Sequence, residues 1–562
     1  MNRRIELIEN SIVNFELYLS THFLFMIRVL SAFFLFFIPC ELTAQILPKE
    51  DSHLNFRIIG FSFPGEKKTA TCSLEIAKGH FNNIDSFKKN IIKSVQCKTN
   101  KIIAEVPAFG CDYTWHTECK DKIVVDLHHF STGITPRIDT ATSRLRIIKK
   151  AEKYKDAYVF CDGTGALYDM SGNPVWYLPD IDNKLVENAD VRDIKLTPQG
   201  TITFGSGNDI YEISYEGIVL WKGPNTGEIS GDSIEYYHHE FTRLTNGDYM
   251  VLGNEPISWK LQGYFKDSSL SYSAQRVARD SNNTFYQKMQ FGTVIEYNNE
   301  GKVVWAWKSF DYFKKSDLLD SKTGMFGIID PHENSFFFDE QNNILYVSFR
   351  DISRIVKVKY PEGKVIASYG TRYVPGMGEM GNDMFYGQHS VKRSKEGYLY
   401  LYNNNAFAAG VFPKIDMISE PASEKDTMKK VWEYQCTQEG MSDDEVSTYN
   451  RQLGQKQQMD LNREINNSGK KNKKKARLTG GGSVMELPDR YLFVSMNNPF
   501  CKIFILNTDK KIMWNSILEK KDSKDGNWHQ QATYRASIIA DPKNLELLIW
   551  NAENVKDGPK RQ

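Results

Sequence analysis

Three histidines stand at the starts of three similar strand patterns in this 562-residue chain. His239, His332 and His389 each lie about eight to eleven residues before a polar turn that contains Gly or Asn. The recurrence of one residue type in one position predicts that the three imidazoles occupy equivalent structural slots. A single such histidine is more often a buried structural hydrogen-bonding residue, but three in register favour a shared chemical role.

The residues near these histidines are suited to binding a tetrahedral oxyanion. Asn334 follows His332 by two residues, and Arg350 follows it by 18. An arginine offers a planar fork of donors to sulfate or phosphate. A neutral imidazole can serve as a nucleophile or as a base. No cluster of Asp or Glu accompanies these positions, so the pattern favours an oxyanion over a hard metal ion.

A repeating strand pattern positions these residues. From about residue 155, an apolar strand, a Gly or Asn turn and a strand that ends in Trp recur, as in 166–176, 210–221 and 294–305. These hairpins alternate with strand pairs that carry the histidines at their starts. Two such hairpins make a four-stranded sheet, and a radial repeat of such sheets is a β-propeller. The pattern predicts an all-β fold with a six-bladed β-propeller over residues 151–562.

The ring is expected to close by placing both ends of this domain in one blade. Residues 157–178 are expected to supply its outer hairpin, and residues 534–550 its inner hairpin. The innermost strands of a propeller line a central channel, so corresponding strand starts converge even when they are far apart in sequence. The fold therefore predicts that the three histidines meet at one axial site.

The first 44 residues have the layout of an export signal. A basic residue precedes an apolar run of about ten residues and a small residue before Gln45, which is typical of a secretory signal peptide. The run is shorter than the about 20 apolar residues that span a bilayer. Residues 1–44 are therefore predicted to be a signal peptide with an upstream segment, and Met26 the true start. We expect a periplasmic or secreted protein, with an uncleaved anchor or a lipoprotein attached at Cys40 as less favoured alternatives.

Residues 45–150 predict a small N-terminal β domain that resembles a sandwich, because short alternating runs are broken by Gly, Pro and Asn. Four cysteines cluster in this domain, at Cys72, Cys97, Cys111 and Cys119. Disulfides persist in exported proteins. Two disulfides are therefore expected here, with their connectivity open.

The overall charge points away from nucleic acid. Lys and Arg number 71 against 70 Asp and Glu, so no net field attracts polyanions or acidic membranes. The partner is expected to be a small molecule recognised by local chemistry. One basic, Gln-rich insertion at residues 441–477 has the composition of a mobile, solvated loop.

Several segments together resemble the bacterial arylsulfotransferase family, the aryl-sulfate sulfotransferases. They are 238–241 with 246–247, 330–334 with 348–350, 388–390 with 402–404, and 534–536. The resemblance runs in order through roughly residues 155–555. It implies an exported six-bladed propeller that transfers a sulfuryl group from an aryl sulfate donor to a phenol acceptor. It further implies a ping-pong route through a sulfohistidine, without a nucleotide sulfate donor, a cofactor or a metal.

The resemblance also implies individual roles. His389 is expected to be the nucleophile, and His239, His332, Asn334 and Arg350 to surround the sulfuryl oxygens. Either His239 or His332 is expected to act as the base for the attacking phenol. Substrate contacts are expected from His238, Gln388, Tyr386, Ser483 and Arg535.

Two other functions stay open at the level of sequence. One is an aryl sulfate hydrolase that passes the group to water. The other is a catalytically inactive propeller that binds an anionic ligand or a protein. Departures from the family pattern give weight to the second, since Glu240 stands where an Asp follows the paired histidines and Ser483 matches a later hydroxyl only loosely.

Overall fold

The computed structural model describes most of the chain between residues 52 and 551. The described ranges are 52–62, 72–97, 99–119, 122–123, 126–134, 143–181, 191–260, 277–282, 284–313, 331–370, 384–405, 412–421, 428–436, 481–497, 500–522 and 524–551. The expected signal segment and the basic insertion at 441–477 lie outside them. Within these ranges, no helix has both the length and the apolar character needed to cross a membrane.

The N-terminal unit packs two sheets against each other. The larger sheet has the order β1 (Ser52–Leu54), β8 (His128–Thr132), β6 (Asp112–Cys119), β3 (Cys72–Lys78) and β4 (Ile91–Cys97), with β7 (Lys122–Ile123) beside β6. The smaller sheet pairs β2 (Ile58–Ser62) with β5 (Lys101–Glu105), and α2 (Ile84–Lys88) precedes β4. Apolar side chains alternate along β3 and β5, and Leu74, Ile76 and Phe61 join one core. The predicted sandwich-like unit is confirmed.

The cysteines of this unit differ from expectation. Cys111 carries a free thiol, so the four clustered cysteines cannot form the two disulfides expected from sequence. In the sheet register Cys72 lies opposite Cys97 on one side and Cys119 on the other. The connectivity of the other cysteines stays open.

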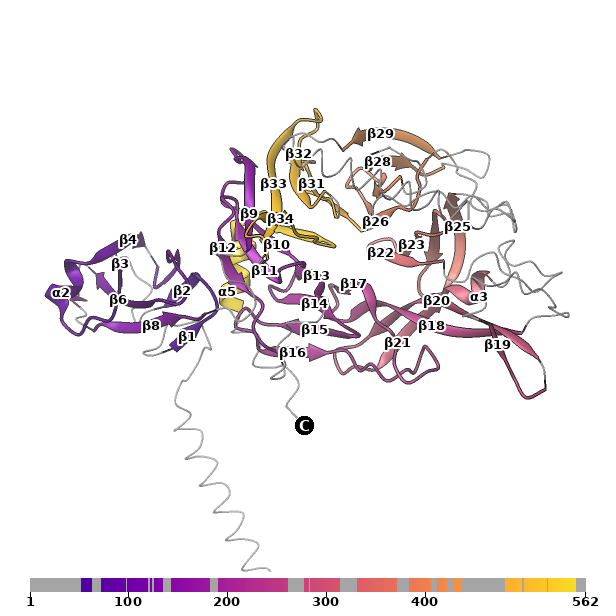
Figure 1. Ribbon diagram of the computed structural model, residues 1–562, viewed down its shortest axis with the longest axis horizontal. Coiled ribbons are helices and arrows are strands. Elements are labelled where there is room, and N and C mark those ends of the chain that lie inside the picture. Colours follow the sequence, from indigo (N-terminus) through magenta and orange to yellow (C-terminus); the bar gives the residue numbers. More distant parts are fainter. Residues whose placement is uncertain are drawn as a thin grey trace, which may run out of the picture.

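The other strands form sheets arranged around one axis (Figure 1). Two sheets, innermost strand first, are β13 (Val191–Leu196), β14 (Ile202–Ser206), β15 (Asp209–Ile213), β16 (Val219–Lys222), and β22 (Glu333–Asp339), β23 (Ile344–Phe349), β24 (Arg354–Lys359), β25 (Lys364–Gly370). A third is β26 (His389–Arg393), β27 (Leu399–Asn403), β28 (Lys414–Ser419), β29 (Lys429–Gln435).

Two further sheets carry extra strands. One contains β17 (His238–Arg243), β18 (Tyr249–Lys260), β20 (Phe285–Tyr297), β19 (Val277–Arg279) and β21 (Val303–Lys308), followed by α3 (Ser309–Phe313). The other contains β30 (Ser483–Glu486), β31 (Leu492–Ser495), β32 (Lys502–Leu506), β33 (Ile512–Lys521), β34 (Trp528–Gln530) and β9 (Ser143–Lys149). The predicted all-β propeller class is confirmed. The exact number of blades stays a prediction. The described residues form six sheets in this part of the chain, which corresponds to the predicted number.

Both ends of the propeller meet in the remaining sheet. It has the order β12 (Pro174–Tyr177), β11 (Ala166–Asp169), β10 (Tyr158–Cys161) and β35 (Ala536–Ile539). The expected inner hairpin over 534–550 is wrong in its second half, where α5 (Pro542–Trp550) forms instead. Asp541 caps this helix and Pro542 opens it, which favours a helix over a second strand. Leu545, Leu548 and Ile549 then bury one helical face.

Polar turns and tryptophans explain the outer hairpins. Asn298 accepts hydrogen bonds from the N–H groups of Glu300 and Lys302, and Gly301 adopts φ 80°, where a side chain is disfavoured. The indole N–H of Trp514 donates to the carbonyl of Met170 in the neighbouring sheet at 3.0 Å. These bonds fix the turns and join adjacent blades.

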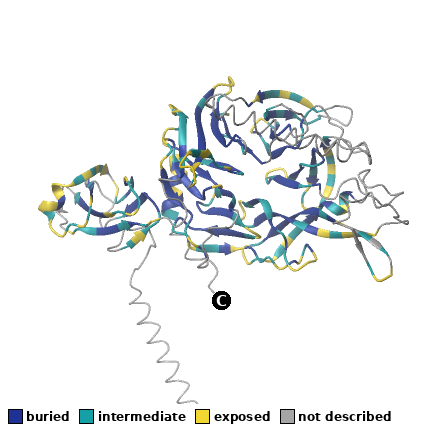
Figure 2. Cartoon of the chain, in the orientation of Figure 1, coloured by how far each residue is buried: buried dark blue, intermediate teal, exposed yellow. Residues whose placement is uncertain are grey.

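The N-terminal unit is docked on the propeller. The Tyr215 hydroxyl donates to the carbonyl of Ile58 at 2.6 Å, and the Arg57 guanidinium donates to the carbonyl of Pro174 at 2.9 Å. One hydrophobic core runs across this junction and includes Phe61 and Trp176. Figure 2 shows buried residues concentrated on the strands nearest the axis. The propeller core therefore supports the inner strand starts on which the candidate site lies.

Candidate functional site

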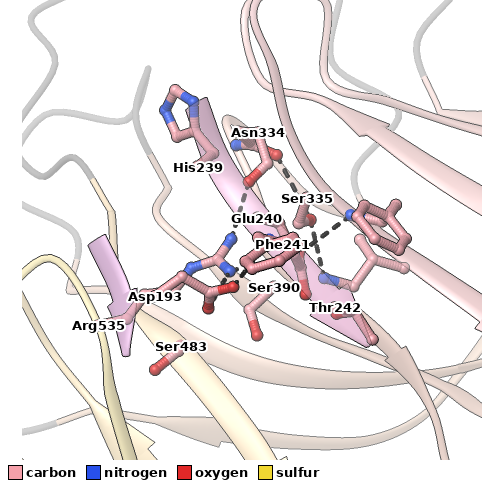
Figure 3. A network of polar contacts seen from close by, with 12 residues as sticks. Asp193, His239, Glu240, Phe241, Thr242, Asn334, Ser335, Ser390, Ser483 and Arg535 are labelled. Atoms are coloured by element: carbon pink, nitrogen blue, oxygen red, sulfur yellow. Dashed lines mark hydrogen bonds and ion pairs between the residues drawn. The ribbon is translucent and has the colours of Figure 1, made fainter. Parts of the chain in front are cut away.

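A ring of side-chain hydrogen bonds joins the innermost strands at one level of the axis. We call these residues the girdle: Asp193, Glu240, Ser335, Ser390, Ser483 and Ser537. Each bonds to the backbone of the next innermost strand; Glu240 Oε2, for example, accepts from the N–H of Phe336 at 3.1 Å. Asp193, Ser335 and Ser390 likewise accept from a backbone N–H of the next strand, whereas Ser483 and Ser537 donate to a backbone carbonyl there. The girdle provides a common level from which positions on different blades can be compared (Figure 3).

At this level the three histidines do not occupy equivalent positions, contrary to the prediction from sequence. His239 and His389 each directly precede a girdle residue, and so does Asn334, whereas His332 lies three residues before Ser335. The three histidines therefore do not share one slot, and Asn334 holds the position predicted for His332. The pairing shifts register near the start of these strands, and His239 and His332 adopt φ of 56° and 59°. A β-bulge inserts a residue that counting back from the next turn does not reveal.

His389 is fully buried at the start of β26 and is held from both ring nitrogens. Its Nδ1 lies 2.6 Å from Oδ1 of Asn404, and the N–H of Gly481 donates to its Nε2 at 3.2 Å. The Asn404 amide nitrogen donates to the carbonyl of Gly481 at 2.8 Å, so its oxygen faces the ring. An amide oxygen only accepts, which places the proton on Nδ1 and the lone pair on Nε2.

The charge state of His389 is set by its surroundings. Burial, reinforced by the positive charge of Arg350, lowers the pKa of His389 well below its usual value, although Asn404 opposes this change. The ring is therefore neutral near pH 7. A neutral imidazole with a fixed lone pair on Nε2 is the form required of a nucleophile.

Gly481 approaches this ring closely because it has no side chain. Its φ is 74°, and a Cβ at this position would lie 2.7 Å from the Tyr534 ring and 2.8 Å from Nδ2 of Asn497. Only glycine combines this backbone conformation with this proximity. The hydrogen bond from the Gly481 N–H to Nε2 of His389 therefore requires glycine at position 481.

Replacing Asn404 tests the role of this tautomer. Asn404→Leu is expected to lower the sulfuryl transfer predicted from the sequence by about 10- to 100-fold, because the Nδ1 proton loses its nearer acceptor and keeps only the carbonyl of Gly387, at 3.2 Å. Asn404→Asp keeps an oxygen acceptor and serves as the matched variant, with a smaller loss. Initial rates with a chromogenic aryl sulfate and phenol measure the effect; equal losses in both variants would contradict it.

His239 projects from β17 and contacts three other rings. Its Nδ1 lies 2.7 Å from Nδ1 of His238, and its ring centroid lies 5.2 Å from that of His332 and 5.4 Å from that of Tyr534. Burial, the His238 ring and the His332 ring lower the pKa of His239 well below its usual value. A neutral His239 is available as a proton acceptor.

Tyr534 lies between His239 and His389, the two histidines that directly precede a girdle residue. Its ring centroid is 6.1 Å from that of His389 as well as 5.4 Å from that of His239, and the Arg192 guanidinium lies 4.8 Å from its centre. Its hydroxyl is buried and has no hydrogen-bond partner among the described residues. Burial raises the pKa of Tyr534 to about 12, so the hydroxyl stays protonated near pH 7.

Arg350 and His332 are brought together by the backbone. The N–H of Arg350 donates to the carbonyl of His332 at 2.9 Å, which confirms that the two strand ends meet. Nε of Arg350 donates to Asp351 at 2.8 Å, and the Arg350 side chain is about one fifth exposed. His332 is also partly exposed. Arg350 thus places a cationic group beside the axial histidines.

Two predicted contacts instead support the strand start. The Asn334 amide donates to the carbonyl of Gln388 at 2.7 Å. The Gln388 amide nitrogen in turn donates to the Ser348 hydroxyl and to the carbonyls of Phe349 and Arg354. Both side chains are fully buried. Gln388 therefore belongs to the buried scaffold that supports the start of β26, and Asn334 holds the backbone of Gln388, next to His389.

Arg535 lies in a buried ion-pair network at the girdle (Figure 3). Its guanidinium donates to Asp193 at 2.9 Å and to the carbonyl of Asn334 at 2.8 Å, and it lies 3.3 Å from Glu240. Glu240 also pairs with Lys392. Burial alone would raise the pKa of Glu240, but Lys392 and Arg535 outweigh it and hold that pKa at about 2. This network places buried, paired charges next to the site.

The other predicted contacts lie at its margins. Ser483 belongs to the girdle, where its hydroxyl donates to the carbonyl of Ala536 at 3.3 Å. Tyr386 is partly exposed, and its N–H donates to Asn403. Asn404, Tyr534 and Arg192 were not predicted as site residues from the sequence. Asn404 and Tyr534 do lie within segments that carry the family resemblance, and Arg192 precedes a girdle residue as His239 and His389 do.

The described residues offer one group with metal-binding spacing, and it lies elsewhere. Asp522, Asp525 and His529 are exposed near the turn between β33 and β34. His529 Nε2 already lies 2.9 Å from Asp525. The axial histidines are instead surrounded by arginine and amide groups, a donor set that fits an anion.

Residues 265–457 match the family model described as Arylsulfotransferase (ASST). The matched segment contains His332, Asn334, Arg350 and His389. The resemblance seen in the sequence is confirmed for this part of the chain, and it supports aryl sulfotransfer in general. No curated protein matches the sequence.

Solved structures show only distant likeness. One is a protein of unknown function from Bacteroides caccae, with 10% identity and a TM-score of 0.36, covering 68% of this chain and 99% of that one. Another is the Cps50 (Swd1) β-propeller domain from Myceliophteria thermophila, with 8% identity and a TM-score of 0.33, covering 71% and 99%. An auxiliary nutrient binding protein from Bacteroides thetaiotaomicron has 10% identity and a TM-score of 0.27, covering 88% and 93%. None of these likenesses bears on the function.

Proposed function

We propose that the protein transfers a sulfuryl group from an aryl sulfate to a phenol by a ping-pong mechanism through sulfo-His389. The match of residues 265–457 to the arylsulfotransferase family supports this reaction class. The observation that carries the mechanism is the neutral His389 ring, with Nδ1–H directed at Asn404 and the lone pair on Nε2.

In the first half-reaction, Nε2 of His389 attacks the sulfur atom of the donor. The N–S bond forms, the S–O bond to the aryl group breaks, and the electron pair leaves with the phenolate. Attack requires Nε2 to release the hydrogen bond from Gly481, whose N–H can then donate to a sulfuryl oxygen. Arg350 stabilises the negative charge on these oxygens, and a fixed donor of this kind contributes about 3 kcal/mol.

In the second half-reaction, the phenol oxygen attacks the sulfur and returns the electron pair to Nε2 of His389. Neutral His239 is the proposed base, because its low pKa leaves it unprotonated near pH 7. A covalent intermediate lets donor and acceptor use one site in turn. We also propose that this reaction takes place outside the cytoplasm, as expected from residues 1–44.

A transfer assay tests the function and separates it from its alternatives. Purified protein with 4-nitrophenyl sulfate is expected to release 4-nitrophenol faster when phenol is added, with formation of phenyl sulfate. Release that does not depend on phenol would indicate a hydrolase. Binding of the aryl sulfate without any release would indicate an inactive binding propeller.

The first half-reaction should have an unusual pH dependence. Neutral His389 is the reactive form, and a lowered pKa keeps it neutral to lower pH. The burst of phenolate release is therefore expected to stay constant as pH falls from 8 to about 6.5, the ordinary histidine value, and to decline only below it. Stopped-flow absorbance at several pH values measures this; half of the burst rate lost at or above pH 6.5 would contradict it.

A further inference from the structure

His238 was expected to contact substrate, but both of its ring nitrogens are engaged within the protein. Its Nε2 lies 3.1 Å from the carbonyl oxygen of Gly253, and its Nδ1 lies 2.7 Å from Nδ1 of His239. Both rings are only partly buried. The contact between the two Nδ1 atoms is short enough to require a hydrogen bond, so one nitrogen donates and the other accepts.

The Gly253 carbonyl decides the direction of this bond. A carbonyl oxygen only accepts, so His238 carries its proton on Nε2 when the ring is neutral. Its Nδ1 is then the acceptor, and Nδ1 of His239 is the donor. The lone pair of neutral His239 is consequently on Nε2, the nitrogen farther from His238. The chain from Gly253 to His238 to His239 thus fixes the tautomer of the proposed base.

We propose that His238 is a positioning residue and proton relay that makes His239 the base of the acceptor half-reaction. The inference rests on the proposed function and deepens it. As the phenol oxygen bonds to sulfur and the S–N bond to His389 breaks, the phenol proton moves to Nε2 of His239. The Nδ1 proton of His239 then moves to Nδ1 of His238. The positive charge comes to rest on His238, which keeps its bond to Gly253.

The surroundings of His239 favour this movement of charge. His332, Tyr534, His389 and Arg535 face it from other strands, and Arg535 is cationic. A proton held on His239 would therefore meet positive charge close to the axis. Transfer to His238 moves that charge to the neighbouring ring, whose Nε2 lies 3.1 Å from the carbonyl oxygen of Gly253. The paired histidines at 238 and 239 thereby acquire distinct roles.

The test compares two substitutions in the full-length protein. His238→Phe removes both nitrogens, whereas His238→Asn returns an amide oxygen near the position of Nδ1. The Phe variant is expected to slow the acceptor half-reaction by about 10- to 100-fold, most for weakly acidic phenols, and to change the donor burst by less than about threefold. The Asn variant restores the acceptor for Nδ1 of His239 but cannot take up its proton, so it is expected to restore the tautomer of His239 and to recover only part of this loss. His529→Asn, on an exposed turn, is the control.

A spectroscopic readout stands apart from activity. With ¹⁵N-labelled histidine, His239 is expected to show a protonated Nδ1 and an unprotonated Nε2 in the wild type, and a mixture of tautomers in His238→Phe. Equal slowing of both half-reactions, no slowing, or a protonated Nε2 on wild-type His239 would overturn the inference. If the wild type forms no adduct on His389, the proposed function fails, and the tautomer measurement still decides whether His238 orients His239.

Discussion

His389→Ala is expected to lower transfer from aryl sulfate to phenol by at least about 10⁴-fold. The substitution removes the proposed nucleophile, the neutral imidazole that is held by the Asn404 amide oxygen and the Gly481 backbone N–H. Both half-reactions are expected to be lost together. Rates of donor release and of phenyl sulfate formation measure this.

Two companion variants make this result interpretable. His389→Gln fills more of the buried space, and it is expected to be equally inactive if the nucleophile matters. His529→Ala, at an exposed histidine, is expected to keep wild-type activity. Circular dichroism and thermal unfolding show whether each variant folds. More than about one hundredth of wild-type activity in folded His389→Ala would contradict the covalent mechanism.

Glu240→Ala is expected to destabilise the protein by about 3–5 kcal/mol, because it leaves the buried charges of Arg535 and Lys392 with one fewer partner. It also removes the girdle bond to the N–H of Phe336. Chemical unfolding measures the loss. Glu300→Ala, at an exposed ion pair with Lys302, is the matched control and should change stability by less than about 0.5 kcal/mol.

The same carboxylate gives a pH dependence with a defined sign. The pKa of Glu240 is about 2 in the folded protein and near 4.5 in its ordinary state. Its contribution to stability is therefore complete above about pH 4.5 and is lost as pH falls toward 2. Glu240→Ala should lack this part of the acid transition. If Glu240→Ala lowers the free energy of unfolding at pH 7 by less than about 1 kcal/mol, the network does not stabilise the fold as expected.

The sequence was informative where residue type and period agree. Alternating strands, Asn and Gly turns and recurring Trp residues predicted the propeller class, because each blade repeats the same pattern of strands and turns. It failed at 542–550, where a short apolar run fits a strand or a helix and the Asp541 cap with Pro542 decides for the helix.

The site was predictable in its members more than in its geometry. His239, His332, Arg350 and His389 do meet at the axis, but the bulged strand starts moved His332 out of the shared slot and put Asn334 there. Asn404 was hard to identify because its role depends on a contact across two strands of one blade. Tertiary hydrogen bonds of this kind leave no period in the sequence.

The central claim is a sulfuryl group on Nε2 of His389, and mass spectrometry tests it most directly. Wild-type protein exposed to 4-nitrophenyl sulfate without acceptor should gain the mass of one sulfuryl group, localised to the peptide that contains His389. Addition of phenol should remove it and yield phenyl sulfate. An adduct on another residue, or turnover of donor and acceptor with no adduct under trapping conditions, would contradict the account.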